Sequence, residues 1–357
     1  DLQLKYRYTW TTSEAFGFVR HCEVENLSDK LLTVEIIDGF QNVLPAGTPR
    51  FTQTNSSNLV DAYKKTELDE TSGLAFFTLY SGITDRAEPC ESLKTNTVFC
   101  LGLKERKVLV SSEQLSAFRA GETLTQEQSK RGIRGAYLVN ASISLAAKGI
   151  KNWQFVANLE QTQSQAVELR QQLSNIDELK NKLLCSIAQG SDELAKIMAS
   201  ADGFQLTGEE NVSEHHYANV LFNVLRGGAF DDHYQVSAND FVSTIKGFNN
   251  GVYSRHQAFF NTLPTSLTIE QLLAAVNAQH DPQLARLAGE YLPIYFGRRH
   301  GDPSRPWNQF AIKLKDDDNN SLLTYQGNWR DIFQNWEALS FSYPTFVENI
   351  IAKFVHA

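Results

Sequence analysis

Two patterns of hydrophobic and polar residues divide this chain of 357 residues. Up to about residue 160, apolar and polar residues alternate in short runs that are rich in β-branched and aromatic side chains, which is typical of half-buried strands. We therefore expect antiparallel sheets over residues 1–160, arranged as a large β-sandwich of supersandwich type, and no parallel sheet. The runs are "LKYRYTWT", "GFVRHCEVEN", "LLTVEIIDGF", "LAFFTLYSGI", "TVFCLGL", "YLVNASISLAA" and "NWQFVANLEQ".

The rest of the chain has a helical period. Beyond Gln161, apolar residues recur every three or four positions, as in "SQAVELRQQLSNIDELKNKLLCSIAQG", which is the spacing of one buried helix face. We expect a helical linker over residues 161–200 and the first part of a barrel of paired helices, of (α/α)6 type, over residues 201–357. Further helical stretches are "SEHHYANVLFNVLRGG", "SANDFVSTIKGFNNGVYSRHQAFFNTL", "TIEQLLAAVNAQH" and "PQLARLAGEYLPIYF".

Both ends of the chain lack the usual start and stop signals. "DLQLKYRYTW" enters strand-like alternation at its first residue, and "ENIIAKFVHA" keeps a helical period to the last. The helical half is also too short for a twelve-helix ring at roughly 11–12 residues per helix plus loops. We therefore expect a fragment of a longer chain with an incomplete barrel, and an exposed apolar face around Ile350, Ile351 and Phe354.

Composition narrows the class of protein. Hydrophobic residues make up 42% of the chain and aromatic residues 11%, enough to bury the cores of two globular domains. The net charge of -8 comes from interspersed acids and bases without a basic block, which argues against nucleic acid as a partner. No apolar stretch approaches the roughly 20 residues of a membrane helix, and the N-terminus lacks a signal-peptide layout, so we expect no membrane partner.

Four cysteines lie apart, without CxxC spacing, at Cys22, Cys90, Cys100 and Cys185. We expect them to be buried, reduced thiols of a cytoplasmic protein. The chain also contains no GxGxxG, P-loop or GxSxG pattern, so dinucleotide, nucleotide and serine-hydrolase chemistry have no support.

The segment "GNWRDIFQNWEAL", residues 327–339, is the first candidate for chemistry. Asn328 suits the N-cap of a helix that begins at Trp329, which puts Asp331 at the third helical position. An acid is favoured there by the free amides and the helix dipole whatever the protein does. Gln334 shares the face of Asp331, however, and a carboxylate, an amide and an aromatic plate together are typical of a sugar site.

Asn328-Trp329-Arg330-Asp331 resembles the Asp-Trp-Asn-Asp stretch of the inverting disaccharide phosphorylases, which include cellobiose and chitobiose phosphorylases. Asn328 and Arg330 depart from that stretch, but the predicted order of β-sandwich, helical linker and helical barrel is similar to the family's. The resemblance implies that Trp329 borders the sugar and that Asp331 is the general acid. It also implies a disaccharide or oligosaccharide substrate, no cofactor, and inorganic phosphate as co-substrate. The family's phosphate-binding residues lie largely beyond its acid, so this pattern encodes no complete phosphate pocket before Ala357.

A second donor-rich segment is "YFGRRHGDPSRPWNQF", residues 295–310. Its guanidinium groups could clamp an anion, while Asp302 and Trp307 could hold the hydroxyls and the apolar face of a sugar. The alternative is a solvated loop whose arginines pair with the acids at 316–318. We expect both segments to line one pocket, with the acid at Asp331 and substrate-binding side chains at Trp329, Arg299, Asp302, Arg305, Trp307 and Gln334. No metal site is expected, because His215 and His216 are adjacent and no HxxxH or HxxE spacing occurs near them.

Three functions stay open on the sequence. The leading one is inverting cleavage of a glycosidic bond by phosphate, which needs one acid and no protein base. Hydrolysis on the same scaffold would need a base roughly 6.5–9.5 Å from the acid, for which Asp302 is preferable to Glu337. The third is a non-catalytic carbohydrate-binding protein whose β-sandwich binds the glycan. Expected partners are the sugar and either the remainder of a longer chain or a second copy.

Overall fold

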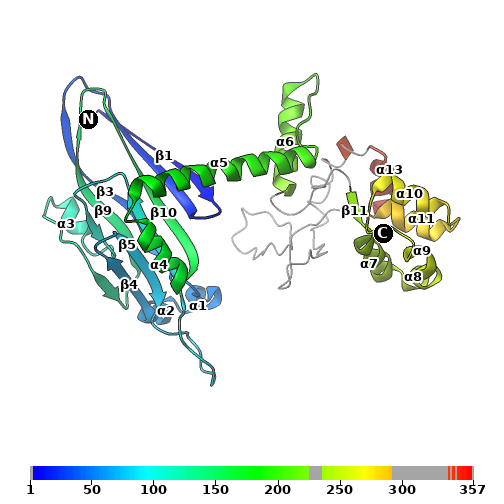
Figure 1. Ribbon diagram of the computed structural model, residues 1–357, viewed down its shortest axis with the longest axis horizontal. Helices are drawn as coiled ribbons and strands as arrows, with labels where there is room; N and C mark the ends of the chain where they lie inside the picture. Colours follow the sequence, from blue (N-terminus) through cyan, green and yellow to red (C-terminus); the bar gives the residue numbers. More distant parts are fainter. Residues whose placement is uncertain (1–2, 225–234, 292–336, 338–339, 342–343, 356–357) are drawn as a thin grey trace. The chain divides into compact units, whose positions relative to one another are not determined.

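The computed structural model describes residues 3–224, 235–291, 337, 340–341 and 344–355. The chain divides into two compact units, Asp1–Ser191 and Asp192–Ala357. The first unit is made of strands and a few helices, whereas helices predominate in the second (Figure 1). The expected combination of antiparallel β-sheets and helices is confirmed.

Two antiparallel sheets form the first unit, which we call the β unit. The larger sheet has seven strands in the order β1-β2-β10-β6-β5-β4-β8, and the smaller has three in the order β3-β9-β7. Every described strand pair is antiparallel, as the sequence predicts. The strands are β1 (Leu4–Ser13), β2 (Gly17–Asn26), β3 (Leu32–Val43), β4 (Lys64–Asp69), β5 (Leu74–Leu79), β6 (Lys94–Leu101), β7 (Lys107–Leu109), β8 (Ser129–Arg131), β9 (Gly135–Leu145) and β10 (Ile150–Thr162).

The two sheets share one hydrophobic core. Alternate residues of the larger sheet, among them Cys22 and Phe155, pack with Tyr137 and Val139 of β9. Phe155, Tyr137 and Val139 are fully buried. The ring of Tyr137 meets that of Phe155 edge to face, with centroids 6.1 Å apart. The alternation that predicts the strands therefore also assigns one face of each to this core.

Two helices cover part of the other face of the larger sheet, α4 (Gln163–Gln172) and α5 (Ile176–Ser200). A capping box of Thr162 and Gln165 begins α4 directly after β10. Leucines at these helices pack against this face. The second core that results includes Val19, Leu74, Phe99, Leu101, Val156, Leu169, Leu173, Leu179 and Leu183. Short helices in the connections are α1 (Arg50–Asn55), α2 (Ser57–Tyr63) and α3 (Leu115–Arg119).

The second unit contains short helices and one pair of short strands. Residues from Val236 to Tyr291 form one core, to which Phe346 and Ile350 of the last helix also belong. The elements are α6 (Glu210–Val224), β11 (Gln235–Ser237), α7 (Ala238–Phe248), α8 (Asn250–Arg255), α9 (Gln257–Phe260), β12 (Ser266–Thr268), α10 (Ile269–Asn277), α11 (Pro282–Glu290) and α13 (Phe346–Val355).

Two expectations about side-chain exposure need correction. Ile350 is buried, at 8% exposure, because α13 packs its apolar face against the helical core, so the expected exposed face is wrong at this residue. Ile351 is exposed, and the side chain of Phe354 lies outside the described residues. All four cysteines are free, but only Cys22 and Cys100 are buried. Cys90, between β5 and β6, and Cys185, on α5, are exposed, contrary to expectation.

Candidate functional site

The residues that the sequence assigns to the sugar site lie outside the described part of the chain. All of them fall within residues 292–336: Arg299, Asp302, Arg305, Trp307, Trp329, Asp331 and Gln334. Their common pocket and the role of Asp331 therefore remain predictions.

Glu337 is the first described residue after this segment, and it contacts α6. Its Oε2 lies 3.1 Å from Nε2 of His215 and 3.4 Å from Nδ2 of Asn219. The neighbouring His216 turns elsewhere: its Nε2 lies 2.8 Å from the carbonyl oxygen of Asp202, and the side chain is buried. The two histidines therefore contact different parts of the chain. Within the described ranges, no group of three or more His, Cys, Asp and Glu side chains is placed to hold a metal ion.

Among the helices that precede the predicted site, one carboxylate links the end of α8 to the start of α11. Oδ1 of Asp281 caps α11 by accepting from the amides of Gln283, at 2.8 Å, and Leu284, at 3.3 Å. Its Oδ2 lies 2.8 Å from Nε2 of His256 and 3.1 Å from an amino nitrogen of Arg255. The hydrogen bond from His256, together with those from Arg255 and the two amides, holds the pKa of Asp281 well below its usual value.

Residues 230–293 match the family model of glycoside hydrolase family 149 insertion domain 1. The match covers less than a fifth of the chain. No curated protein matches the chain. The matched segment contains β11 to α11 and nearly all of the helical core, so the similarity falls on a set of elements that packs as one domain. It supports a relation to glycoside hydrolases.

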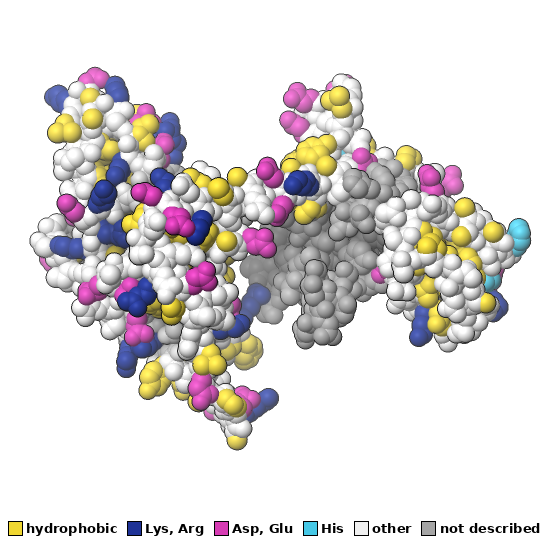
Figure 2. Space-filling model, viewed as in Figure 1, with side chains coloured by type: hydrophobic (Ala, Val, Ile, Leu, Met, Phe, Trp, Pro, Cys, Tyr) yellow, Lys and Arg dark blue, Asp and Glu magenta, His cyan; other side chains and the backbone are white. Residues whose placement is uncertain are grey.

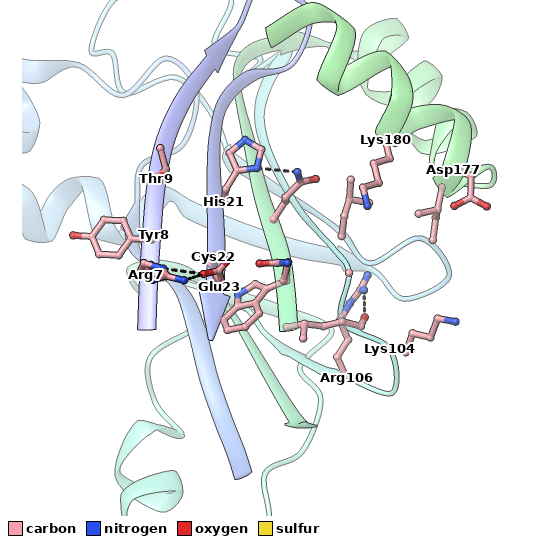
Figure 3. Close-up of a pocket in the computed structure, with 17 residues that line it drawn as sticks. Arg7, Tyr8, Thr9, His21, Cys22, Glu23, Lys104, Arg106, Asp177 and Lys180 are labelled. Atoms are coloured by element: carbon pink, nitrogen blue, oxygen red, sulfur yellow. Dashed lines mark hydrogen bonds and ion pairs between the residues drawn. The ribbon is translucent and has the colours of Figure 1, made fainter. Parts of the chain in front are cut away.

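A cavity of about 550 Å³ lies in the β unit, on the face of the larger sheet that α4 and α5 cover only in part (Figure 3). Strands β1, β2 and β10 provide its floor, and the segment 101–106 and the first turns of α5 provide its walls. All of its lining residues belong to the β unit. This volume lies within the roughly 300–1,000 Å³ that ligand sites have. Local sequence patterns give no sign of this cavity, because strands distant in the sequence build it.

Strand register arranges polar side chains in two rows on the cavity floor. Thr9, His21 and Gln154 are direct cross-strand partners, as are Arg7, Glu23 and Asn152. Since alternate residues of a strand share a face, all six belong to one face of the sheet. The row of Arg7 contains an ion pair of this arginine with Glu23, drawn in Figure 3. The floor therefore offers amide, hydroxyl, imidazole and carboxylate groups side by side.

His21 is held between two neighbours. Its Nδ1 lies 2.9 Å from Nε2 of Gln154, and its Nε2 lies 3.1 Å from Oγ1 of Thr11. Both contacts are compatible with a neutral ring, because the hydroxyl of Thr11 can donate or accept. Burial lowers the pKa of His21, which favours this neutral form.

The wall formed by residues 101–106 depends on a glycine. Gly102 has φ of +94°, and a Cβ there would lie 2.8 Å from the backbone oxygen of Asn152. This close approach brings the segment that follows β6 against β10. Arg106 is fixed in the same wall by donating from Nη1 to the carbonyl of Leu103 at 2.7 Å.

Proposed function

We propose that this protein is part of a carbohydrate-active enzyme that cleaves a glycosidic bond by inverting phosphorolysis, with Asp331 as the general acid. The observation that carries the proposal is the match of residues 230–293 to an insertion domain of a glycoside hydrolase family. The resemblance of Asn328-Trp329-Arg330-Asp331 to the acid-bearing stretch of disaccharide phosphorylases supports the reaction type. No described helix is both long and apolar enough to span a membrane.

The domain layout follows from the same proposal. Residues 1–160 of the β unit take the place of the N-terminal β-sandwich, and residues 161–200 take that of the helical linker. Residues 201–357 then belong to the helical catalytic domain. Because residues 230–293 are similar to an insertion domain, they interrupt this domain and are not barrel helices themselves.

In the proposed reaction, Asp331 transfers its proton to the glycosidic oxygen as the bond to the anomeric carbon breaks. Inorganic phosphate attacks that carbon from the opposite face and forms a sugar 1-phosphate of inverted configuration. Phosphate is already a nucleophile, so no protein base is needed. Trp329 stacks on the sugar, Arg299 and Arg305 hold the phosphate, and Asp302, Trp307 and Gln334 hold the sugar.

Replacing Asp331 tests this role. Asp331→Asn should lower turnover of a natural disaccharide by about 10²- to 10⁴-fold, because the leaving oxygen receives no proton. The same variant should lose far less on an aryl glycoside, whose leaving group needs no proton. Equal losses on both substrates, measured as initial rates, would show that Asp331 positions the sugar and does not protonate it.

Hydrolysis is the closest alternative, and product analysis separates it from phosphorolysis. A hydrolase releases free sugar at the same rate with and without phosphate, whereas a phosphorylase needs phosphate and releases sugar 1-phosphate. The contacts of Glu337 with His215 and Asn219 favour a structural role for this carboxylate. Asp302 thus stays the preferred base if water is the nucleophile.

A row of exposed aromatic rings supports a second candidate, non-catalytic glycan binding by the β unit. Tyr6, Tyr8 and Trp10 occupy alternate positions of β1 and are 47%, 59% and 51% exposed. Trp10 stacks on Phe40 with centroids 5.5 Å apart, so its ring is held in place. Such rings can stack on pyranose faces. If Trp10→Ala abolishes oligosaccharide binding while no turnover of any glycoside is found, binding is the function.

A further inference from the structure

We propose that the cavity of the β unit is a binding site for a phosphorylated monosaccharide. The site consists of the polar floor on β1, β2 and β10, the segment 101–106 and the first turns of α5. It uses none of the residues assigned to bond cleavage. Ligand binding at this site can therefore be tested independently of the proposed reaction.

The floor fits a ligand with several hydroxyl groups. The floor offers both donors and acceptors, because Thr9 and Asn152 can do both and Glu23 only accepts. The amide of Gln154 is held by its contact with His21, in which its Nε2 lies 2.9 Å from Nδ1 of the ring, so its orientation on the floor is fixed.

The walls fit an anion. Four cationic side chains and two carboxylates line the cavity, in a chain whose net charge is -8. Arg7 is paired with Glu23 and Glu25, whereas no ion pair joins Arg106 or Lys180 to a described carboxylate. In Figure 3, Lys180 reaches from α5 toward the cavity, and Arg106 donates to the carbonyl of Leu103 within its own segment. Lys180, which has no carboxylate partner among the described residues, suits a phosphate monoester, which carries about -1.5 to -2 charges at neutral pH.

The cavity does not fit a long neutral glycan or a nucleotide, because neither the tyrosine nor the tryptophan among its lining residues turns its ring toward it. The indole of Trp153 is buried and donates from Nε1 to Asp38 at 2.8 Å, on the core side of the sheet. Tyr8 turns away from the cavity in Figure 3. Without a stacking surface, affinity has to come from hydrogen bonds and charge. A monosaccharide with one phosphate group offers hydroxyl groups for hydrogen bonds and a negative charge, and it is small enough for a cavity of about 550 Å³.

Calorimetric titration of the whole chain tests the site, with glucose 1-phosphate, glucose 6-phosphate, glucose and inorganic phosphate as probes. At least one sugar phosphate should bind more tightly than glucose and more tightly than inorganic phosphate. Equal affinity for inorganic phosphate and both sugar phosphates would overturn the proposal by reducing the site to a simple anion site. Absence of sugar phosphate binding would also overturn it.

Two lysines of α5 give a matched pair of variants. Lys180 lines the cavity, whereas Lys182, two positions on, lies outside it and pairs with Glu178 at 2.8 Å. Both side chains are exposed, so both variants should fold, which circular dichroism checks. Lys180→Met should weaken sugar phosphate binding at this site by about tenfold or more, and Lys182→Met should leave it unchanged. Equal effects of the two changes would contradict the proposal.

A second measurement separates this site from a catalytic one. Ligand that binds the folded β unit raises the midpoint of its unfolding. Sugar phosphate should therefore stabilise the β unit in the parent chain and in Asp331→Asn, but much less in Lys180→Met. If Asp331→Asn loses this stabilisation and Lys180→Met keeps it, the ligand binds at the proposed catalytic site and the cavity has no such role.

Discussion

Glu127 shows how a single buried charge is stabilised in the β unit. The residue is 7% exposed and accepts hydrogen bonds from the amide of Val110 at 2.9 Å, from Ser111 at 3.0 Å and from Gln114 at 2.9 Å. Burial on its own would raise the pKa of Glu127. The hydrogen bonds from Gln114 and Ser111, the charge of Lys130 and the Val110 amide together lower it below the usual value.

Glu127→Gln should destabilise the β unit by about 1–3 kcal/mol at pH 7. The amino group of the new glutamine would replace an oxygen that accepts hydrogen bonds, so it would face the donors around it. The folded-state pKa of Glu127 is lowered, so its contribution is complete above the unfolded value of about 4.3 and is lost as the pH falls below it. The stability difference between parent and variant should thus stay constant from pH 8 to 5.5 and shrink below about pH 4. Urea unfolding across this range measures it.

Glu122→Gln is the matched control, since Glu122 is exposed in the same connection. It should change stability by no more than about 0.5 kcal/mol. A difference for Glu127→Gln that grows as the pH falls would show that the carboxylate is destabilised by burial.

At the scale of elements, side-chain caps define where helices of the matched segment begin. The hydroxyl of Thr268 accepts from the amide of Gln271 at 3.2 Å, and the Gln271 side chain accepts from the amide of Thr268 at 2.9 Å. This capping box starts α10 directly after β12. Ile269 and Leu272 of the first turns can then enter the helical core.

Thr268→Ala should therefore lower the stability of the second unit by about 1 kcal/mol, the usual loss for a missing N-cap. The readout is the midpoint of thermal unfolding followed by circular dichroism. Thr265→Ala, an exposed change three positions earlier and outside any helix, should leave the midpoint unchanged. A similar loss in both variants would rule out the cap as the cause.

At the scale of the whole molecule, the two compact units have separate hydrophobic cores. Acidic and basic side chains are intermingled over the face of the β unit seen in Figure 2. The sequence predicts such a surface from its interspersed charges. Because the two cores are separate, the stability of each unit should depend on its own core and its own helix caps.

Scanning calorimetry should resolve two unfolding transitions. Glu127→Gln should shift only the transition of the β unit, and Thr268→Ala only the other, because no core cluster joins residues of both units in the described part of the chain. A single transition that both variants shift equally would mean that the units unfold together, coupled through α5.

The local patterns of the sequence predict the secondary structure because side-chain periodicity is set by backbone geometry. The alternation in "GFVRHCEVEN" gives β2, and the three-to-four spacing gives α4 and α5. Local patterns miss the short helices α1 and α2 and the break near residues 173–175, where one continuous helical pattern is divided. Those features depend on turns only a few residues long, which carry little periodic signal.

The sequence by itself determined that a strand-rich part precedes a helix-rich part and that the sheets are antiparallel. Only the tertiary structure decided which strands are neighbours. It places β2 between β1 and β10, so Thr9, His21 and Gln154 come together from positions 145 residues apart. It also decided that Ile350 is buried and Cys185 exposed. The physical reason is that periodicity is a property of neighbouring residues, whereas strand order and burial depend on contacts between segments distant in the sequence.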